Sequence, residues 1–399
     1  MKRLHYSHVF GLFLITFSPW LVHGVGFRLP NQDPVAIARG NAFAATADNP
    51  SAIYYNPAGI TRLEGQNMQL GLYAIAAQSS YRSPRGERSE TKFEVQGAPQ
   101  LYYVFSPKEK PFSFGLGLYS PYGLGLEWPE DSGFRTLTLE GRLAYVSLNP
   151  VVAWEIHPTL SLAVGPTVNV GRVRFRRGLL APGDSFLFKG DGADIGFNAG
   201  LLWQPHEQWS FGLSYRSATD INFKDESKAQ PYTPAEDTSA RMDFPQFVIS
   251  GISYRPTKDW NIEVDVDWCD WDALNTVTFK KLSGNSDFPL NFTSSFMYSL
   301  GITRYLNHGY FVSGGYFFSE NSAPDKNFNP SVPDTDQHSF SVGVGKQAQH
   351  WSWAVTYQLL TGSWRTVRDN QSTSLIGESA DGQYKFFNNA VNFSVGYRF

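Results

Sequence analysis

Strict alternation of apolar and polar side chains over residues 390–399 is the feature that most limits what this chain can fold into. A period of two places successive side chains on opposite faces of a β-strand. One face is apolar throughout, and the other carries small or polar side chains. The apolar face consists of Val391, Phe393, Val395, Tyr397 and Phe399, and the opposite face of Asn392, Ser394, Gly396 and Arg398. The sequence therefore predicts a strand with one apolar side at its C-terminal end.

The N-terminus has the layout of a secretory signal peptide. Two basic residues precede an apolar run over residues 9–22, and His23 and Gly24 follow it. The run is too short for a helix that spans a membrane. We expect residues 1–24 to be a signal peptide that is cleaved near Gly24. The alternative is a buried N-terminal helix.

The composition narrows the fold class further. Charged residues make up 17% of the chain, below the roughly 25% usual for soluble domains, and aromatic residues reach 16%. No stretch after the leader approaches the length of a spanning helix, so the mature chain must be a soluble all-β protein or a membrane barrel. The net charge of −3, without a basic patch, argues against nucleic acid as a partner. Cys269 is the single cysteine, so no internal disulfide can form, and we interpret it as a small strand residue rather than a reactive thiol.

Alternating segments recur along the whole chain after about residue 66. Each is long enough to cross a bilayer, which takes about 9–11 tilted residues. The sequence predicts fourteen such strands, at residues 67–81, 97–106, 111–120, 143–156, 160–176, 193–203, 209–223, 244–255, 260–282, 292–306, 310–319, 338–346, 351–365 and 389–399.

The connections between these strands alternate in length. Long polar connections, such as residues 225–243 and 321–337, alternate with short ones. A barrel with tight turns at one end and loops at the other has this pattern, whereas a β-sandwich does not. An even strand count returns both mature termini to the short-turn, periplasmic end. The short turns lie at residues 107–110, 157–159, 205–207, 256–258, 307–309 and 348–350.

The C-terminal strand resembles the closing strand of bacterial outer-membrane barrels, in which the final aromatic residue belongs to the assembly signal. The resemblance and the strand pattern together predict a 14-stranded antiparallel transmembrane β-barrel over residues 67–399. We expect it in the cell outer membrane of a Gram-negative bacterium. Its partners there would be outer-membrane lipid, lipopolysaccharide and the barrel-assembly machinery.

The segment 260–269 indicates which strand face lines the interior. Glu263, Asp265 and Asp267 share one face, and Trp260 and Trp268 share the other. Three carboxylates cannot face lipid, so they line the interior or meet a partner there. The two tryptophans are about one bilayer crossing apart, as expected for interfacial girdles.

Residues 25–66 depart from the strand pattern. They contain the Asx-Pro pairs Asp33-Pro34, Asn49-Pro50 and Asn56-Pro57, in which the first residue can cap a helix and proline suits its first turn. We predict short helices over residues 34–47, 50–55 and 57–63. Because the segment is rich in alanine and nearly uncharged, we expect a hatch that plugs the barrel, which has more volume than its own side chains fill. The alternative is an exposed N-terminal extension.

Several motifs resemble those of the FadL-type transporters of hydrophobic compounds, and together they cover essentially the whole mature chain. The hatch pattern is the most specific of them. The motifs are Gly26-Phe27, Ala47-Asp48-Asn49-Pro50-Ser51-Ala52, Asn56-Pro57-Ala58-Gly59, Ser120-Pro121-Tyr122-Gly123-Leu124-Gly125, and residues 190–198, 212–217, 268–274 and 324–345.

The resemblance implies a hatch-closed barrel that carries long-chain fatty acids or other hydrophobic molecules, such as hydrocarbons. Gly26 and Phe27 would then act as a movable stopper. The residues that hold the hatch against the wall would be Asn56, Pro57, Ala58 and Gly59.

In members of this family the third strand is kinked, which opens a side passage into the bilayer. The matching region here contains Ser120, Pro121, Gly123 and Gly125. Proline lacks a ladder donor and glycine weakens strand pairing, so these residues suit a kink. The alternative is the ordinary start of a loop.

The connection over residues 178–191 is shorter than the long outer loops of the family's prototype. It is nevertheless apolar, and an exposed apolar cluster suits ligand capture. The expected capture residues are Leu179, Leu180, Phe186, Leu187 and Phe188.

Apolar pairs within strands predict apolar patches inside the lumen, because one member of each pair must face inward. The pairs are Tyr102-Tyr103, Val248-Ile249, Phe317-Phe318 and Leu359-Leu360. A water-filled porin keeps its lumen polar, so the pairs favour a channel for hydrophobic solutes. The alternative is a general aqueous porin or an adhesin whose N-terminus is only structural.

The sequence offers no catalytic residues and no metal site. It contains neither a Gly-x-Ser-x-Gly elbow nor a His-Glu-x-x-His motif, so we expect no enzyme. The Gly-x-Gly pairs at residues 115–117 and 343–345 lack the third glycine of a dinucleotide site, and no cofactor is expected. Arg172, Arg174 and Arg176 share one strand face, but none is assigned to a ligand head group.

Overall fold

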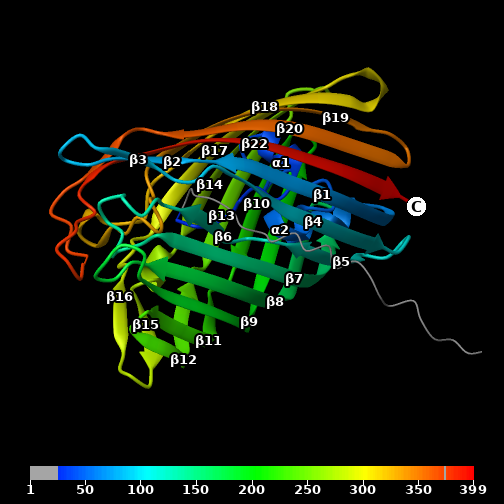
Figure 1. Cartoon of the computed structure of the whole chain (residues 1–399). Coiled ribbons are helices and arrows are strands. Elements are labelled where there is room, and N and C mark those ends of the chain that lie inside the picture. Colours follow the sequence, from blue (N-terminus) through cyan, green and yellow to red (C-terminus); the bar gives the residue numbers. More distant parts are fainter. Residues whose placement is uncertain (1–25, 373) are drawn as a thin grey trace, which may run out of the picture.

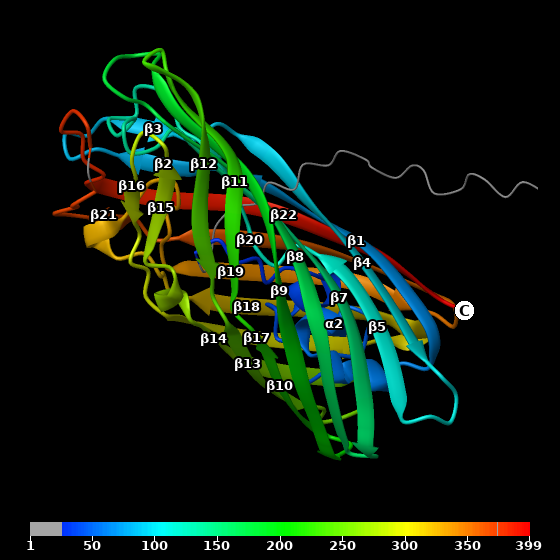
Figure 2. The same cartoon turned by 90° about the horizontal axis from the view of Figure 1, so that it is seen from below.

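The computed structural model describes residues 26–372 and 374–399, so the expected signal peptide lies outside the described residues. All described strands join in an antiparallel sheet that closes on itself as a barrel (Figures 1 and 2). Closure occurs where β1 (Gly65–Ala77) pairs with both β4 (Glu94–Ser106) and β22 (Gly382–Arg398). The wall has fourteen strands, as the sequence predicts, because several labelled strands are consecutive parts of one wall strand.

The wall follows chain order. Eight wall strands consist of two labelled segments each: β1 with β2, β3 with β4, β5 with β6, β10 with β11, β12 with β13, β14 with β15, β16 with β17, and β20 with β21. The remaining bounds are β2 (Ser79–Arg82), β3 (Arg88–Glu90), β5 (Phe112–Tyr119), β6 (Gly123–Glu127), β7 (Glu140–His157), β8 (Leu160–Arg177), β9 (Ser185–His206), β10 (Trp209–Arg216), β11 (Thr219–Gln230), β12 (Thr233–Phe244), β13 (Phe247–Tyr254), β14 (Trp260–Cys269), β15 (Thr276–Lys281), β16 (Ser286–Pro289), β17 (Ser295–Tyr305), β18 (Tyr310–Ser319), β19 (Gln337–Gln347), β20 (Trp351–Gly362) and β21 (Arg365–Val367).

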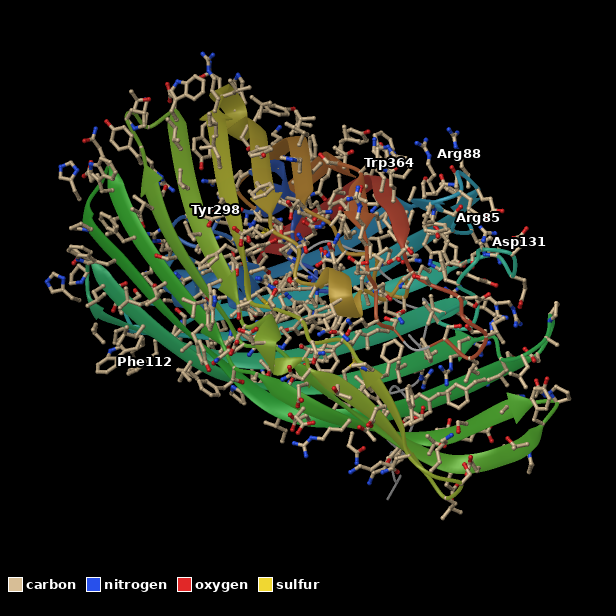
Figure 3. All side chains as sticks on the ribbon, turned by 90° about the vertical axis from the view of Figure 1, so that its left-hand side faces the viewer. Arg85, Arg88, Phe112, Asp131, Tyr298 and Trp364 are labelled. Carbon is tan, nitrogen blue, oxygen red and sulfur yellow. The ribbon has the colours of Figure 1, made fainter. Side chains whose placement is uncertain are left out.

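Burial in the wall is the reverse of that in a water-soluble protein. Large apolar side chains lie on the outside: Phe112 and Tyr298 are each 42% exposed (Figure 3). Their strand neighbours Ser113 and Ser299 are buried inside. In β22 the alternation predicted from the sequence is confirmed, since the Phe393 side chain is exposed. A surface that is apolar outside and polar inside is the pattern of a membrane barrel.

The lumen also contains the predicted apolar patches. One member of each apolar pair is buried inside the barrel, namely Tyr102, Ile249, Phe317 and Leu360. Polar side chains of the wall are interspersed among them. The lumen is therefore packed rather than lined only with polar groups.

The two ends of the barrel differ, as the alternating connections predict. The start of β1 and the C-terminus lie together at the short-turn end, where the Phe399 N–H donates to the Gln66 carbonyl at 3.0 Å. Gly26 does not lie there, because it packs against Trp271, beside the long connections. Residues 225–243 are not a loop. They form most of the β11–β12 hairpin, which is polar on both faces and so escapes an alternation test.

The hatch contains three short helices, α1 (Pro34–Ala38), α2 (Ala52–Tyr55) and the 3₁₀-helix η1 (Pro57–Arg62), which lie inside the ring of strands (Figures 1 and 2). Asp33 caps α1 and Asn56 caps η1 through their side chains, as predicted. The remaining helical turns are 3₁₀-helices in connections: η2 (Trp271–Ala273), η3 (Asn307–Gly309) and η4 (Asp325–Asn327).

The predicted helix over residues 34–47 is wrong beyond Ala38. Gly40 and Asn41 have φ angles of +60° and +66°, which a right-handed helix does not accommodate. The backbone N–H groups of residues 43–46 donate to wall carboxylates instead of to helix carbonyls. Contacts with the wall thus replace local helix bonds. In the described part of the chain, no helix is long and apolar enough to cross a membrane.

Candidate functional site

The carboxylates of β14 hold the hatch in the barrel. Asp265 accepts hydrogen bonds from the backbone N–H groups of Phe43 and Ala44, each at 2.9 Å. Glu263 accepts from Ala45 N–H at 2.7 Å, and its other oxygen pairs with the buried Arg39 at 3.0 Å. The expectation that these carboxylates meet a partner inside the barrel is confirmed.

Asp267, the third carboxylate, binds the first turn of the hatch. Its oxygens lie 2.8 Å and 2.6 Å from the two terminal nitrogens of Arg28. Both side chains are almost completely buried, so this is a charge pair in a low-dielectric interior. Removing either partner would leave the other charge uncompensated.

The Asn56-Pro57-Ala58-Gly59 motif lies at the contact between hatch and wall. The Asn56 amide donates to the carbonyls of Ala44, within the hatch, and Leu201, on β9, at 2.7 and 2.9 Å. A Cβ atom at Gly59 would lie 2.2 Å from the Ala47 carbonyl oxygen, so only glycine fits there. The motif thus links two parts of the hatch to β9.

Glycines in the wall provide room for the hatch backbone. A Cβ atom at Gly212 would lie 2.0 Å from the Ala44 carbonyl oxygen, and one at Gly315 would lie 2.0 Å from the Gly40 nitrogen. Contacts this short do not occur between real atoms. The Gly-x-Gly patterns therefore mark places where the hatch approaches the wall, since Gly115 faces Ile53 and Gly343 faces Ala38.

The third wall strand is interrupted between β5 and β6, in a break that includes Ser120 and Pro121. β5 pairs with both neighbours, but β6 pairs with β7 alone among the described strands. Residues 94–100 of β4 therefore have no ladder partner on this side, and the hydrogen-bond ladder has a gap between β4 and β6. We call this interruption the strand-three gap.

The β4 side chain that crosses the gap is Gln96. Its amide donates to the Gly125 carbonyl at 3.0 Å, and a Cβ atom at Gly125 would collide with that amide. The Lys92 N–H donates to the Glu127 carbonyl at 2.8 Å and closes the gap toward the long connections. The Arg142 guanidinium of β7 also reaches past β6 and pairs with Glu94 of β4 at 2.7 Å. Side-chain contacts therefore replace the ladder across the gap.

Residues 27–32 of the hatch, the gap segment, bind both edges of the gap from inside. On the β6 side, Leu29 N–H donates to the Pro121 carbonyl at 2.8 Å, and Gly123 N–H donates to the Phe27 carbonyl at 2.9 Å. On the β4 side, the Gln100 amide donates to the Asn31 carbonyl at 3.2 Å. The structure thus brings together the two predicted regions, the mature start and the kink.

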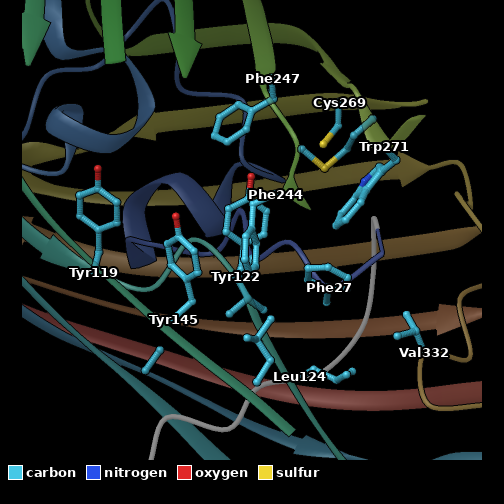
Figure 4. Close-up of a cluster of buried hydrophobic side chains, with 14 of the residues drawn as sticks. Phe27, Tyr119, Tyr122, Leu124, Tyr145, Phe244, Phe247, Cys269, Trp271 and Val332 are labelled. Carbon is cyan, nitrogen blue, oxygen red and sulfur yellow. The ribbon is translucent and has the colours of Figure 1, made fainter. Parts of the chain in front are cut away.

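The Phe27 side chain lies in an aromatic cluster at the gap (Figure 4). Its ring centroid is 4.7 Å from that of Trp271, 5.9 Å from that of Phe244 and 6.2 Å from that of Tyr122. Tyr145 packs on Tyr122 at 5.1 Å. We call Phe27, Tyr122, Tyr145, Phe244 and Trp271 the Phe27 cluster; it is a large buried apolar surface inside the lumen.

The expected exposed capture cluster does not form. Phe186, Leu187 and Phe188 belong to β9, and the rings of Phe186 and Phe188 are buried against Phe279 of β15. Leu180 is exposed at 59%. The reason is strand alternation: β9 extends beyond its predicted start and turns these phenylalanines inward.

Leu179 is half-buried and packs against the same interior cluster. A groove of about 230 Å³ lies among the outer connections, and Leu137, Phe288 and Leu375 contribute its apolar lining. A larger cavity of about 940 Å³ opens below the hatch at the short-turn end, lined by residues such as Arg62 and Tyr397.

The arginines of β8 do not face the lumen. Arg174 and Arg176 pair with Glu140 on the outer side of the barrel, at 2.9 and 3.6 Å. Sequence reasoning missed Arg28, Arg39 and Gln96, which anchor the hatch or cross the gap. Only the unmatched carboxylates of β14 signalled that cations would be needed opposite them.

Comparison with known proteins agrees with this architecture. Residues 15–399 match the model of the family described as "Outer membrane protein transport protein (OMPP1/FadL/TodX)". The chain is 21% identical to the long-chain fatty acid transport protein of Escherichia coli K12, over 83% of this chain and 85% of that protein. It is 24% identical to the 47 kDa outer membrane protein of Pasteurella multocida, over 80% and 82% of the two chains.

Two solved structures show the same fold. A FadL homologue from Pseudomonas aeruginosa superposes with a TM-score of 0.86 at 16% identity, covering 94% of this chain and all of that one (100%). The Pseudomonas putida toluene transporter TodX gives a TM-score of 0.75 at 15% identity, with 94% and 100% covered.

Proposed function

Because the chain belongs to the OMPP1/FadL/TodX family of outer-membrane transport proteins, whose members are transporters rather than enzymes, we propose that it takes up hydrophobic molecules by passive diffusion, with the hatch as its gate. Long-chain fatty acids and monoaromatic hydrocarbons are the solutes that the names of similar proteins suggest. The observation that carries the proposal is the gap segment, which binds both edges of the strand-three gap.

The proposed route begins at the long connections, which face the cell exterior. The groove lined by Leu137, Phe288 and Leu375 would capture the solute, together with the exposed side chain of Leu180. The solute then enters the Phe27 cluster. Apolar burial stabilises such a solute by about 25 cal/mol per Å², so entry needs no energy source.

Release would occur sideways into the bilayer. A solute that displaces the Phe27 ring also loosens the gap segment, because Phe27 and Leu29 bond the β6 edge through their backbone. When the gap segment withdraws, only side-chain contacts span the strand-three gap, namely the Gln96 amide and the Arg142–Glu94 ion pair. Gly26 and Phe27 are then the moving stopper, and Asn56, Pro57, Ala58 and Gly59 keep the rest of the hatch fixed.

The proposal also covers how the barrel is oriented and assembled. The short-turn end, with the C-terminus and the start of β1, would face the periplasm. The apolar outer surface would contact membrane lipid, and the charged outer-side residues Glu140, Arg174 and Arg176 would contact lipopolysaccharide. The barrel-assembly machinery would recognise β22 with its terminal Phe399.

Reconstituted liposomes test the function. We expect the protein to accelerate transfer of a fatty acid or toluene into the liposome membrane while sugars enter no faster than into empty liposomes. Deletion of residues 26–30 should change solute binding and uptake. Rapid sugar entry through the intact protein would instead support an aqueous porin, and an unchanged deletion variant would refute the stopper.

A further inference from the structure

Arg216, at the end of β10, is a buried cation without an acidic partner among the described residues. Arg216 is only 5% exposed. One terminal nitrogen donates to the Tyr119 hydroxyl at 2.6 Å. Its Nε and its other terminal nitrogen have no hydrogen-bond partner in the described structure. Buried guanidinium groups are normally paired, because an uncompensated buried charge is costly.

Aromatic rings form the immediate surroundings of this guanidinium. Its carbon lies 5.3 Å from the Tyr54 ring centroid, 5.2 Å from that of Tyr119 and 5.8 Å from that of Phe247. Arg28 lies over the same Phe247 ring at 3.7 Å. Cation–π contacts partly offset the free-energy cost of burying a charge, but they do not provide hydrogen-bond acceptors for the unpaired N–H groups.

The local charges do not balance. Asp267 is paired with Arg28, so its carboxylate neutralises that arginine and not Arg216. Arg216 adds a second positive charge beside the same ring, and no second carboxylate pairs with it among the described residues. The site therefore lacks one negative charge, next to two unsatisfied N–H donors.

The position of Arg216 relates it to the proposed route. Tyr119, its hydrogen-bond partner, is the last residue of β5 and borders the strand-three gap. In Figure 4 Tyr119 lies on the side of the Phe27 cluster that is away from Trp271. An amphiphile whose apolar part lies in the Phe27 cluster could thus place its polar end at Arg216.

We propose that Arg216 binds the carboxylate head group of an amphiphilic solute and makes the channel select monocarboxylates over neutral molecules of the same length. This inference rests on the proposed function and deepens it. A guanidinium presents parallel N–H donors that match a carboxylate, and a charge-assisted pair of this kind is stronger than a neutral hydrogen bond. One missing negative charge matches a monocarboxylate.

Equilibrium dialysis with decanoate and decanol tests the assignment on the intact, detergent-solubilised protein. The wild type should bind decanoate at least about tenfold more tightly than decanol. Arg216→Gln should lose that preference while its affinity for decanol stays within about twofold. Arg304→Gln, which removes an exposed arginine at the short-turn end of β17, should keep the wild-type preference.

The possible outcomes separate the role of Arg216 from the proposed function. Equal wild-type affinities for decanoate and decanol would overturn the role of Arg216 even if Arg216→Gln failed to fold. The role of Arg216 would also be overturned if a folded Arg216→Gln protein kept the preference for decanoate. An equal loss of affinity for decanoate and decanol in that variant would overturn it too. Failure of the wild type to bind either molecule would instead refute the proposed function.

Discussion

At the scale of single residues, the hatch depends on glycines where its backbone approaches the wall. Gly315 and Gly314 are neighbours on β18, yet a Cβ atom would lie 2.0 Å from the hatch at Gly315 and would meet nothing within 4 Å at Gly314. We expect Gly315→Ala to push residues 39–40 inward and to weaken the packing of the hatch against the wall by about 1–3 kcal/mol. The signal is a rise in ion conductance across planar bilayers. Gly314→Ala is the matched control and should conduct like the wild type; equal conductance of the two variants would contradict the account.

Glu263 offers a second test at this scale, through charge rather than space. Glu263→Gln removes the partner of Arg39, which is 1% exposed and would remain as a buried charge. The expected cost is about 3–5 kcal/mol of hatch stability. Limited proteolysis should cleave residues 26–64 faster than in the wild type. Glu207→Gln, in an exposed short turn, should leave the cleavage rate unchanged, and an equally protected Glu263→Gln hatch would argue against the anchoring role.

At the scale of elements, the sequence predicts what obeys local rules. Every predicted strand is present because lipid on one side and lumen on the other enforce alternation. The helix over residues 34–47 could not be predicted to stop at Ala38, since the cause is a pair of carboxylates more than 200 positions away. The sequence did not predict that the side chains of Phe186 and Phe188 face the barrel interior, for a similar reason. It depends on how far β9 extends past the membrane, which no local pattern records.

The connection between β18 and β19 gives an element-scale prediction about pH. Burial raises the pKa of the Asp334 carboxyl to about 6 from an ordinary value of 3.8, and backbone hydrogen bonds, including one from Gly26, only partly oppose this. The folded chain therefore binds this proton more tightly than the unfolded chain. The contribution to stability is fully present below about pH 3.8 and is lost as the pH rises to about 6, by at most about 3 kcal/mol.

Urea unfolding in detergent between about pH 3.5 and pH 7 measures this loss. We expect the midpoint of the wild type to fall across the range and that of Asp334→Asn to fall less, since an amide does not ionise. Asp336→Asn, at an exposed neighbouring carboxylate, should behave like the wild type. Identical pH profiles for the wild type and Asp334→Asn would show that Asp334 does not carry the effect.

At the scale of the whole molecule, the barrel and its hatch form one packed interior whose weak point is in the wall. Strand count, direction and the presence of a plug follow from the sequence. The position of Gly26 does not follow from the sequence. An even number of strands places the start of β1 at the short-turn end, but the hatch runs through the lumen and places Gly26 against Trp271. Contacts between distant segments, such as Arg28 with Asp267, decide that path.

A reversible covalent lock across the strand-three gap tests the central claim most directly. Arg28 and Tyr122 face each other in an antiparallel bridge, a spacing that a disulfide can span. In a Cys269→Ser background, Arg28→Cys with Tyr122→Cys should transfer fatty acid into liposome membranes at least about tenfold more slowly when oxidised than after reduction. Equal transfer rates in the two redox states would show that solute does not pass by displacing the gap segment.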